Sequence, residues 1–187
     1  MLPFQVNESI VLELIQSRDR DELYALIDEN RKYLRAWLLW VDKRQSPSDL
    51  DSVIEVWTHN YEEKNGFDSG IWFNEQLVGM LGLHYIDWTN RATSIGYFLA
   101  ESAQGKGIIT KSIEQLLKYL FNELKLNRVI IQCAENNFKS RAIPEKIGFS
   151  YEGTSREAQW VYDHYENIVT YSLLSSEWHT QTVEYIV

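Results

Sequence analysis

The sequence contains a single cysteine, Cys133, among 187 residues. No disulfide can therefore form within the chain, and a reducing compartment is its natural setting. No apolar run approaches the length of a membrane-spanning helix, and the N-terminus lacks the basic and apolar regions of a signal peptide. The four histidines show no metal-ligand spacing with Cys133. We therefore expect a soluble, cytoplasmic protein without membrane association and without a metal.

Positive charge is scarce: 18 Lys and Arg stand against 27 Asp and Glu, which gives a formal net charge of −9. Because phosphate contacts supply most of the non-specific affinity for nucleic acid, this balance argues against direct nucleic-acid binding. It favours a cationic or amine-bearing partner, although solubility alone would also explain it. No repeat, linker or low-complexity tract divides the chain, and 44% hydrophobic residues suffice for one core. We expect a single domain over residues 1–187.

The first half of the chain predicts one strand followed by helices. Alternating apolar residues predict the strand over 9–15. Amphipathic spacing then predicts helical segments over 19–27, 31–41 and 46–64. Asp19 and Glu22 have the spacing of a capping box at the start of the first segment. Ser46 is the expected N-cap of the third, with Pro47 at its first helical position.

The second half alternates strands and helices. A polar turn at 74–76 between two apolar runs predicts a hairpin. Helical spacing over 108–124 places six aliphatic side chains on one face. The expected strands cover 71–73, 77–85, 92–99, 129–131, 149–157 and 165–174, and a second, short helix covers 140–147. This order predicts a mixed α/β domain.

The turn from Gln104 to Ile109 joins an expected strand to the long helix. Gly105 and Gly107 allow the backbone to turn tightly and to approach a bound group closely. Amides that open a helix favour anions, so this turn is a candidate pyrophosphate site; the alternative is a flexible connection. The spacing fits neither a P-loop, which needs Ser or Thr after the lysine, nor the dinucleotide fingerprint, where Thr110 replaces the third small residue.

This turn and its surroundings resemble the acetyl-CoA signature of the GNAT superfamily. Gln104, Gly107 and Ile109 occupy the positions of its Gln/Arg-x-x-Gly-x-Gly/Ala pattern, after the strand Ser94-Ile95-Gly96-Tyr97-Phe98-Leu99-Ala100-Glu101. The RimJ/RimL branch, which acetylates N-terminal amines of ribosomal proteins, tolerates the departure at Ile109. Three further stretches resemble that branch: Trp37-Leu38-Leu39-Trp40-Val41, Asn137-Phe138-Lys139-Ser140 and Glu145-Lys146-Ile147-Gly148-Phe149.

The resemblance implies the GNAT fold, an α+β arrangement with a central, mostly antiparallel sheet of about seven strands and flanking helices. Its strands 4 and 5 would splay for acetyl-CoA, with the backbone of 97–99 along the pantetheine arm and the 104–109 amides on the pyrophosphate. Asn137 would contact the arm near its thiol end, and Lys106 would either add charge to the phosphates or stay solvated. The implied cofactor-binding residues are Tyr97, Phe98, Leu99, Gln104, Gly105, Lys106, Gly107, Ile108, Ile109 and Asn137.

Amide formation from a thioester needs a proton for the departing thiolate. Many GNAT enzymes supply it from a tyrosine, but the corresponding position here is Pro144. By resemblance to the RimJ/RimL branch, the acid would be Ser140. The structural alternative is that Ser140 only caps its short helix.

The general base stays open. The glutamate often found in the branch is replaced by Gln159, and Glu157 would point to the opposite face of a strand. Glu101, His84 and an ordered water remain candidates. An α-amine has a pKa near ~8, so its neutral form costs only about 1 kcal/mol at pH 7, whereas a lysine or polyamine nitrogen near ~10.4 would cost about 4–5 kcal/mol. The lack of an obvious base therefore favours an α-amine acceptor.

We predict an acetyl-CoA-dependent N-acetyltransferase whose acceptor is a primary amine, at the N-terminus of a ribosomal or other protein. Two alternatives remain: a polyamine or antibiotic as acceptor, and an acyl-CoA-binding sensor without catalysis, which Pro144 and Gln159 motivate. Trp37 and Trp40 would either wall the acceptor groove or pack the helices onto the sheet. The 13% aromatic content and the resemblance predict a homo-oligomer, most simply a dimer.

Overall fold

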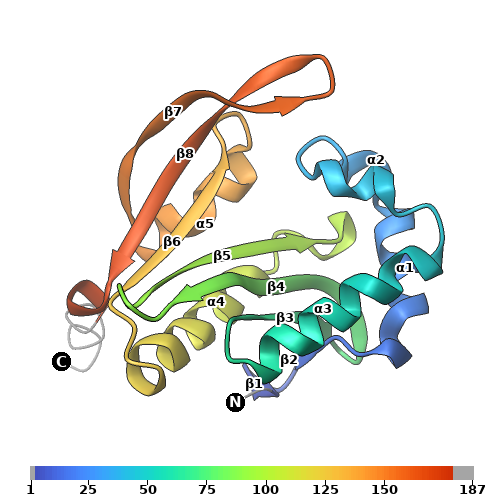
Figure 1. The fold of residues 1–187 in the computed structure, drawn as a ribbon, viewed down its shortest axis with the longest axis horizontal. Helices are drawn as coiled ribbons and strands as arrows, with labels where there is room; N and C mark the ends of the chain where they lie inside the picture. The colour runs from blue at the N-terminus through green and yellow to red at the C-terminus, as the bar shows by residue number, and fades with distance from the viewer. Residues whose placement is uncertain (1–2, 179–187) are drawn as a thin grey trace.

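A computed structural model describes residues 3–178; the ends of the expected domain, 1–2 and 179–187, lie outside the described residues. An eight-stranded sheet forms its centre, in the order β1-β2-β3-β4-β5-β6-β8-β7 (Figure 1). The strands are β1 Phe4–Gln5, β2 Ile10–Leu14, β3 Phe67–Phe73, β4 Gln76–Asp87, β5 Ala92–Leu99, β6 Arg128–Ala134, β7 Ser150–Val161 and β8 His164–Leu174. All neighbours pair antiparallel except β5 and β6. The expected mixed, mostly antiparallel sheet is confirmed, with the two-residue β1 as its additional strand.

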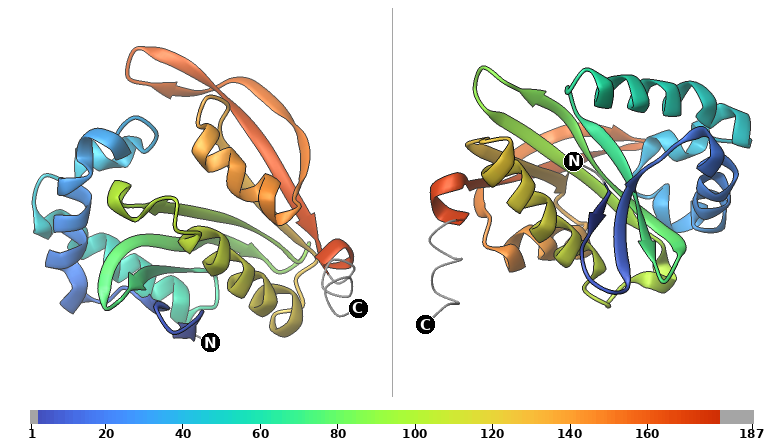
Figure 2. Two further views of the ribbon diagram at one scale, coloured as in Figure 1. Left: turned by 180° about the vertical axis from the view of Figure 1, so that it is seen from behind. Right: turned by 90° about the horizontal axis from the view of Figure 1, so that it is seen from below.

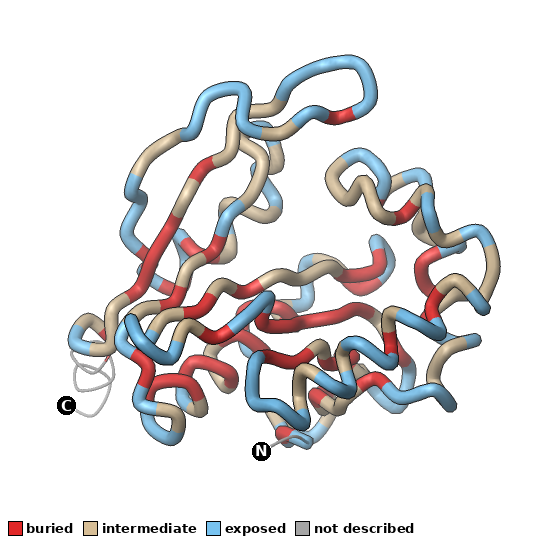
Figure 3. The backbone as a smooth tube through the Cα atoms, viewed as in Figure 1, coloured by how far each residue is buried: buried red, intermediate tan, exposed pale blue. Residues whose placement is uncertain are grey.

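Helices cover both faces of the sheet. Helices α1 and α3 pack on β4 and β3 on one face, and α4 and α5 lie together on the other (Figure 2). The helical segments are η1 Ser17–Asp19, α1 Arg20–Glu29, α2 Arg31–Leu34, η2 Leu39–Lys43, η3 Pro47–Leu50, α3 Asp51–Glu62, η4 Glu101–Ala103, α4 Ile108–Lys118, the π-helical η5 Tyr119–Glu123 and α5 Phe138–Ile147. The buried side chains concentrate on the central strands and on α4 (Figure 3). No helix among the described residues is long and apolar enough to cross a membrane.

Two of the predicted helix starts have different outcomes. Ser46 is the N-cap and Pro47 holds the first position, as predicted; Asp49 completes a capping box with Ser46, and η3 leads directly into α3. The predicted box of Asp19 and Glu22 is wrong. The Asp19 carboxylate accepts from the backbone of Gln16 at 2.9 Å, one turn earlier, and Glu22 instead accepts from the backbone N–H of Leu77 at 3.1 Å.

The segment 31–41 is not one helix. Helix α2 ends at Leu34, and the chain turns before η2 begins at Leu39. Arg31 explains the break, because its guanidinium donates to the carbonyl of Val41 at 2.7 Å and also to that of Arg44. The chain therefore folds back on α2 instead of extending it.

The parallel pair β5 and β6 separates partway along its length. Residues 92–95 pair with 128–131, but beyond Ile95 the two strands share no hydrogen bonds. Strand β6 continues to Ala134 against β8, and β5 continues to Leu99 against β4. The splay predicted for these strands is confirmed, and it opens a cleft in the middle of the sheet.

Candidate active site

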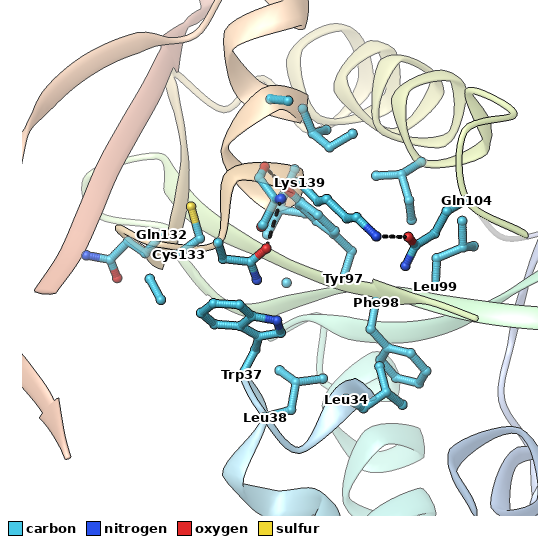
Figure 4. A pocket seen from close by; sticks show the side chains of 18 of the residues that line it. Leu34, Trp37, Leu38, Tyr97, Phe98, Leu99, Gln104, Gln132, Cys133 and Lys139 are labelled. Carbon is cyan, nitrogen blue, oxygen red and sulfur yellow. Dashed lines mark hydrogen bonds between the residues drawn. The ribbon is translucent and has the colours of Figure 1, made fainter. Parts of the chain in front are cut away.

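The splay contains a cleft of about 1030 Å³. Its wall combines β4, β5, β6, β7 and β8 with α2, the start of α4 and one side of α5 (Figure 4). Of the expected cofactor-binding residues, nine line it: Tyr97, Phe98, Leu99, Gln104, Gly105, Gly107, Ile108, Ile109 and Asn137. The exception is Lys106, whose ammonium group lies 5.4 Å from the ring centroid of Phe73.

The glycine turn leaves a set of free amides at the mouth of the cleft. Gly105 and Gly107 have φ values of 75° and 72°, a left-handed conformation that favours glycine. Gly107 is the N-cap of α4, and no side chain caps the amides that follow it. A Cβ at either glycine would meet nothing within 4 Å. The turn thus combines open space with the positive end of an eleven-residue helix, which suits a pyrophosphate group.

The charged side chains among the described residues that line the cleft are all positive. Lys139 and Lys146 line it, and the Lys139 ammonium donates to the side-chain oxygen of Gln104 at 2.8 Å. No aspartate or glutamate is among the described residues that line the cleft. In a chain of net charge −9, this local excess of positive charge favours an anionic ligand.

Asn137, not Ser140, caps α5. The Asn137 side-chain oxygen accepts from the backbone N–H of Ser140 at 3.1 Å, so the alternative reading of Ser140 as the N-cap is wrong. Pro144 lies buried inside the same helix. The Ser140 hydroxyl is therefore not required by the helix start.

Ser140 and Tyr97 form a hydrogen-bonded pair in the cleft wall. The Tyr97 hydroxyl donates to the backbone carbonyl of Ser140 at 2.9 Å, and the Ser140 hydroxyl lies 3.3 Å from the Tyr97 oxygen as donor. Burial raises the pKa of Tyr97 far above its usual value, so its hydroxyl stays protonated. The resemblance implied only a backbone role for Tyr97. Its side-chain contact with Ser140, which is 43 residues away, could not be predicted from neighbouring residues. Burial also raises the pKa of the neighbouring Cys133 thiol.

Among the candidate bases, His84 reaches the cleft and Glu101 does not line it. His84 stands in a bulge of β4, where pairing with β5 shifts between Leu83 and Ile86. Its Nδ1 lies 2.9 Å from the Ser94 hydroxyl, and the surrounding protein lowers the pKa of the imidazole. His84 is therefore neutral near pH 7 and able to accept a proton.

Strand β7 is irregular near the position where the resemblance to the RimJ/RimL branch would place a glutamate base. Its side chains there do not simply alternate between the two faces of the sheet. A bulge lies between Ser155 and Gln159, and Glu157 has a left-handed φ of 50°. Its backbone N–H donates to the Asn167 side chain at 2.8 Å. Gln159 lines the cleft and Glu157 does not, so the neutral residue occupies the cleft wall.

The two tryptophans of the N-terminal region have different positions. Trp37 lines the cleft, where Figure 4 shows it beside Leu38. Trp40 packs on Phe98 with ring centroids 5.8 Å apart. Trp40 therefore matches the packing alternative, whereas a place for Trp37 in the wall of the acceptor groove stays a prediction. Residues 3–178 contain no group of three or more His, Cys, Asp or Glu side chains placed to hold a metal ion.

The splayed sheet, the glycine turn and the cleft define an acyl-CoA-dependent transferase, and comparison with known proteins agrees. The model of the acetyltransferase (GNAT) domain family matches residues 9–150. The chain belongs to this family and is an acetyl-CoA-dependent acetyltransferase.

Its relatives include proteins that act on ribosomal proteins. The chain is 40% identical over 179 residues to the "Putative ribosomal N-acetyltransferase YdaF" of Bacillus subtilis (strain 168), covering 95% of this chain and 98% of the relative. It is 29% identical to the ribosomal-protein-serine acetyltransferase of Escherichia coli (strain K12), covering 90% and 94%.

Solved structures have the same fold. A structure described as a probable acetyltransferase has a TM-score of 0.90 at 40% identity, covering 95% of this chain and 99% of the other. The microcin C7 self-immunity acetyltransferase MccE, solved in complex with acetyl-CoA and AMP, has a TM-score of 0.89 at 27% identity, covering 92% and 96%.

Proposed function

We propose that the acceptor of this acetyltransferase is the N-terminal α-amine of a protein, with a ribosomal protein as the first candidate. The observation that carries this proposal is the lack of carboxylates among the described residues of the cleft wall. A polyamine or lysine carries charges that an acidic wall would stabilise, and its neutral form costs about 4–5 kcal/mol at pH 7. Deprotonation of an α-amine at pH 7 costs only about 1 kcal/mol. A single neutral imidazole is a sufficient general base for that step.

Acetyl-CoA would bind with its pyrophosphate on the amides from Gly105 to Ile109. The left-handed glycines, the free helix start and the open space beside them support this placement. The pantetheine arm would follow the unpaired edge of β5 from Tyr97 to Leu99. The side-chain nitrogen of Asn137 would donate to the arm, since the side-chain oxygen is taken by the helix cap. The thioester would then lie near Ser140, the proposed acid.

The names of the two relatives above support a ribosomal-protein acceptor. A more distant relative, the spermidine N(1)-acetyltransferase of Vibrio cholerae, is 23% identical over 173 residues. Its name supports the alternative, a small-molecule amine as acceptor. The proposed co-substrate and acceptor are cytoplasmic, so we place the reaction in the cytoplasm. We also propose that the enzyme is a homo-oligomer.

The acceptor proposal is tested by acetyl-CoA turnover with a panel of amines. The panel contains peptides with the N-termini of ribosomal proteins, the same peptides with a blocked N-terminus and one internal lysine, spermidine, and an aminoglycoside. We expect kcat/KM to be highest for the free N-termini and to fall to the hydrolysis background for the blocked peptides. Higher kcat/KM for spermidine or the aminoglycoside would reject an α-amine acceptor. Background rates with every acceptor would instead support a sensor.

A further inference from the structure

Four side chains of the cleft wall carry a carboxamide, and most of them are bonded within the protein. The four are Gln104, Gln132, Asn137 and Gln159. The side-chain oxygen of Gln104 accepts from the Lys139 ammonium at 2.8 Å. The side-chain nitrogen of Gln132 donates to the Thr170 hydroxyl at 3.0 Å, and Asn137 caps α5. Three of the four carboxamides therefore have a partner within the protein.

The carboxamide of Gln159 has no such partner. Neither its oxygen nor its nitrogen is hydrogen-bonded to any residue of the described chain, 3–178. The side chain is half-buried, so its polar atoms are only partly available to bulk water. A carboxamide is uncharged and both donates and accepts hydrogen bonds. The group that matches it is another amide, such as the main chain of a peptide.

The bulge in β7 sets the position of Gln159. Between the pairs Ser155–Ile168 and Gln159–Glu166, three residues of β7 lie opposite a single residue of β8. Bulges of this kind bend a strand and re-aim its side chains, and they are frequent beside active sites. Because Gln159 pairs directly with Glu166, it projects to the same face as Ile168, which also lines the cleft.

Asn167 of β8 holds this bulge in place. Its side-chain oxygen accepts from the backbone N–H of Glu157 at 2.8 Å, and its side-chain nitrogen donates to Glu135 at 2.7 Å. The left-handed φ of 50° at Glu157 is costly for a residue other than glycine, and such conformations persist only where their surroundings fix them. The backbone that leads to Gln159 is therefore fixed by side chains from two other segments.

The carboxylates nearest to Gln159 along the strands are engaged outside the cleft. Glu166 accepts from the side-chain nitrogen of Asn136 at 3.2 Å and lies 3.1 Å from Nε2 of His164. Glu135 accepts from Asn167, and neither glutamate lines the cleft. Both lysines of the cleft wall belong to α5. The part of the wall that β7 supplies is therefore uncharged, which suits an uncharged part of the acceptor.

A second unused polar group lines the same cleft. The indole N–H of Trp37 has no hydrogen-bond partner among residues 3–178. Its segment is joined to the β7–β8 turn by the bond from the Tyr162 hydroxyl to the Asp42 carboxylate at 2.8 Å, and Figure 1 shows that turn beside α2. Two connected segments thus present a carboxamide and an indole donor that no group of the described chain uses.

We propose that Gln159 determines acceptor specificity by bonding to the main chain of the acceptor's second residue, with Asn167 as its positioning residue. In an extended chain the N–H and C=O of one residue point to the same side, so one carboxamide can accept from the first and donate to the second. The indole N–H of Trp37 provides a further donor for the same segment. This inference rests on the proposed α-amine acceptor, and it defines that acceptor as an extended N-terminal segment that is recognised through its backbone.

The same contact selects against a polyamine. A protonated polyamine offers hydrogen-bond donors but no acceptor, so the side-chain nitrogen of Gln159 would lose its contact with water and gain no partner in exchange. A site that hydrogen-bonds one substrate rejects an analogue that lacks the matching group for this reason.

The first test combines a variant with a change in the acceptor. Two matched peptides differ only in the first peptide bond, which is an amide in one and an ester, without the N–H, in the other. The amide-to-ester ratio of kcat/KM should be about three- to tenfold higher in the wild type than in Gln159→Leu, as expected for one hydrogen bond. The lower basicity of an amine beside an ester affects both proteins equally and cancels in this comparison.

Gln132→Leu is the matched control, because it removes a carboxamide of the cleft wall whose nitrogen is already bonded to Thr170. It should keep the wild-type amide-to-ester ratio. Asn167→Ala should lower the ratio toward that of Gln159→Leu and have no further effect in the double variant, which a purely structural role would not produce. CoA affinity, measured by calorimetry, should be the same in all of these proteins.

A second variant changes the charge and keeps the size of the side chain. Gln159→Glu replaces the donor by a carboxylate, which repels a peptide carbonyl and attracts a cationic chain. The ratio of kcat/KM for spermidine to that for the amide peptide should rise about tenfold or more. The measured quantity is this ratio, because a carboxylate in the cleft could also act as a base on both acceptors.

The outcomes separate this inference from the acceptor proposal. If the wild type does not turn over free N-termini above background, the α-amine proposal fails and the role of Gln159 fails with it. If the wild type acetylates them and Gln159→Leu keeps the wild-type amide-to-ester ratio, only the contact from Gln159 is rejected. An unchanged spermidine-to-peptide ratio in Gln159→Glu would likewise reject Gln159 as the specificity-determining residue.

Discussion

At the scale of single residues, the Ser140 hydroxyl is not used to cap α5, because Asn137 forms the cap. Asn137 supplies the cap of α5, and the Ser140 hydroxyl is held at the Tyr97 oxygen in the cleft wall. The Tyr97 hydroxyl beside it stays protonated and donates to the backbone carbonyl of Ser140. The structure removes the structural alternative for Ser140, and its role as the acid stays a prediction.

Ser140→Ala should lower kcat about 10²–10⁴-fold, or about 3–5 kcal/mol of barrier, and leave CoA affinity nearly unchanged. Its melting temperature should stay close to that of wild type, because the cap is intact. Asn137→Ala, which removes the cap, should cost about 1 kcal/mol of stability. Steady-state kinetics and thermal denaturation of both variants distinguish the two roles. A Ser140→Ala enzyme with normal kcat would show that another group protonates the thiolate.

At the scale of elements, the turn before α4 links backbone conformation to cofactor binding. Gly107→Glu would place a side chain and a negative charge where the pyrophosphate is proposed to lie, and it would strain a left-handed position. CoA affinity, measured by calorimetry, should fall at least tenfold, and the rise in melting temperature that bound CoA gives by mass action should shrink. Gly153→Glu is the matched control, because Gly153 also has a positive φ and open space but lies on β7. If both variants bind CoA as wild type does, the turn is not the phosphate site.

An ion pair and a hydrogen bond to the same carboxylate connect the three C-terminal strands. Arg128 of β6 donates to both carboxylate oxygens of Glu152 on β7, and the Ser172 hydroxyl of β8 donates to the same carboxylate at 2.8 Å. These bonds, from Arg128 first, lower the pKa of Glu152 to about 2. A lowered pKa contributes stability above the unfolded value near 4.5 and loses it as pH falls toward 2.

Glu152→Gln should therefore reduce the melting temperature at pH 7 and have a much smaller effect near pH 2. Glu157→Gln, at an exposed position on the same strand, is the control and should change little at either pH. The check is thermal denaturation of the three proteins across this range. An equal loss in Glu152→Gln at both pH values would mean that packing, not the ion pair, is responsible.

The elements that could be predicted from the sequence are those that are determined by residues close together in the chain. The helix start at Ser46, the long amphipathic helix and the glycine turn each follow from neighbouring residues. The break after α2 depends on Arg31 reaching carbonyls ten or more residues away, and a periodicity argument has no access to that contact.

At the scale of the whole molecule, two segments that are far apart in the sequence meet beside the cleft. The Tyr162 hydroxyl, at the β7–β8 turn, donates to the Asp42 carboxylate at 2.8 Å, and the Arg35 guanidinium lies 4.8 Å from the Tyr162 ring centroid. Trp37 from one segment and Gln159 from the other both line the cleft.

The aromatic excess noted in the sequence is partly on the surface. Five of the eight large hydrophobic residues with exposed side chains fall in the last third of the described chain: Phe138, Tyr151, Trp160, Tyr162 and Tyr165. Trp160 and Tyr165 stack edge to face on the β7–β8 pair with centroids 4.8 Å apart. Strand β7 is an edge strand that is exposed along most of its length (Figure 3). Exposed aromatics on an open edge are typical of a surface that is covered by association.

We therefore expect a homo-oligomer, most simply a two-fold dimer that uses the β7–β8 surface. Light scattering at micromolar concentration should give at least twice the 22.0 kDa of one chain. Trp160→Glu should return the protein to the monomer mass, because a charge at the centre of an apolar contact is costly to bury. Trp88→Glu, at an exposed tryptophan on the β4–β5 turn, is the matched control and should leave the mass unchanged. A wild-type mass of 22.0 kDa would reject association, and dissociation by Trp88→Glu alone would move the interface to that turn.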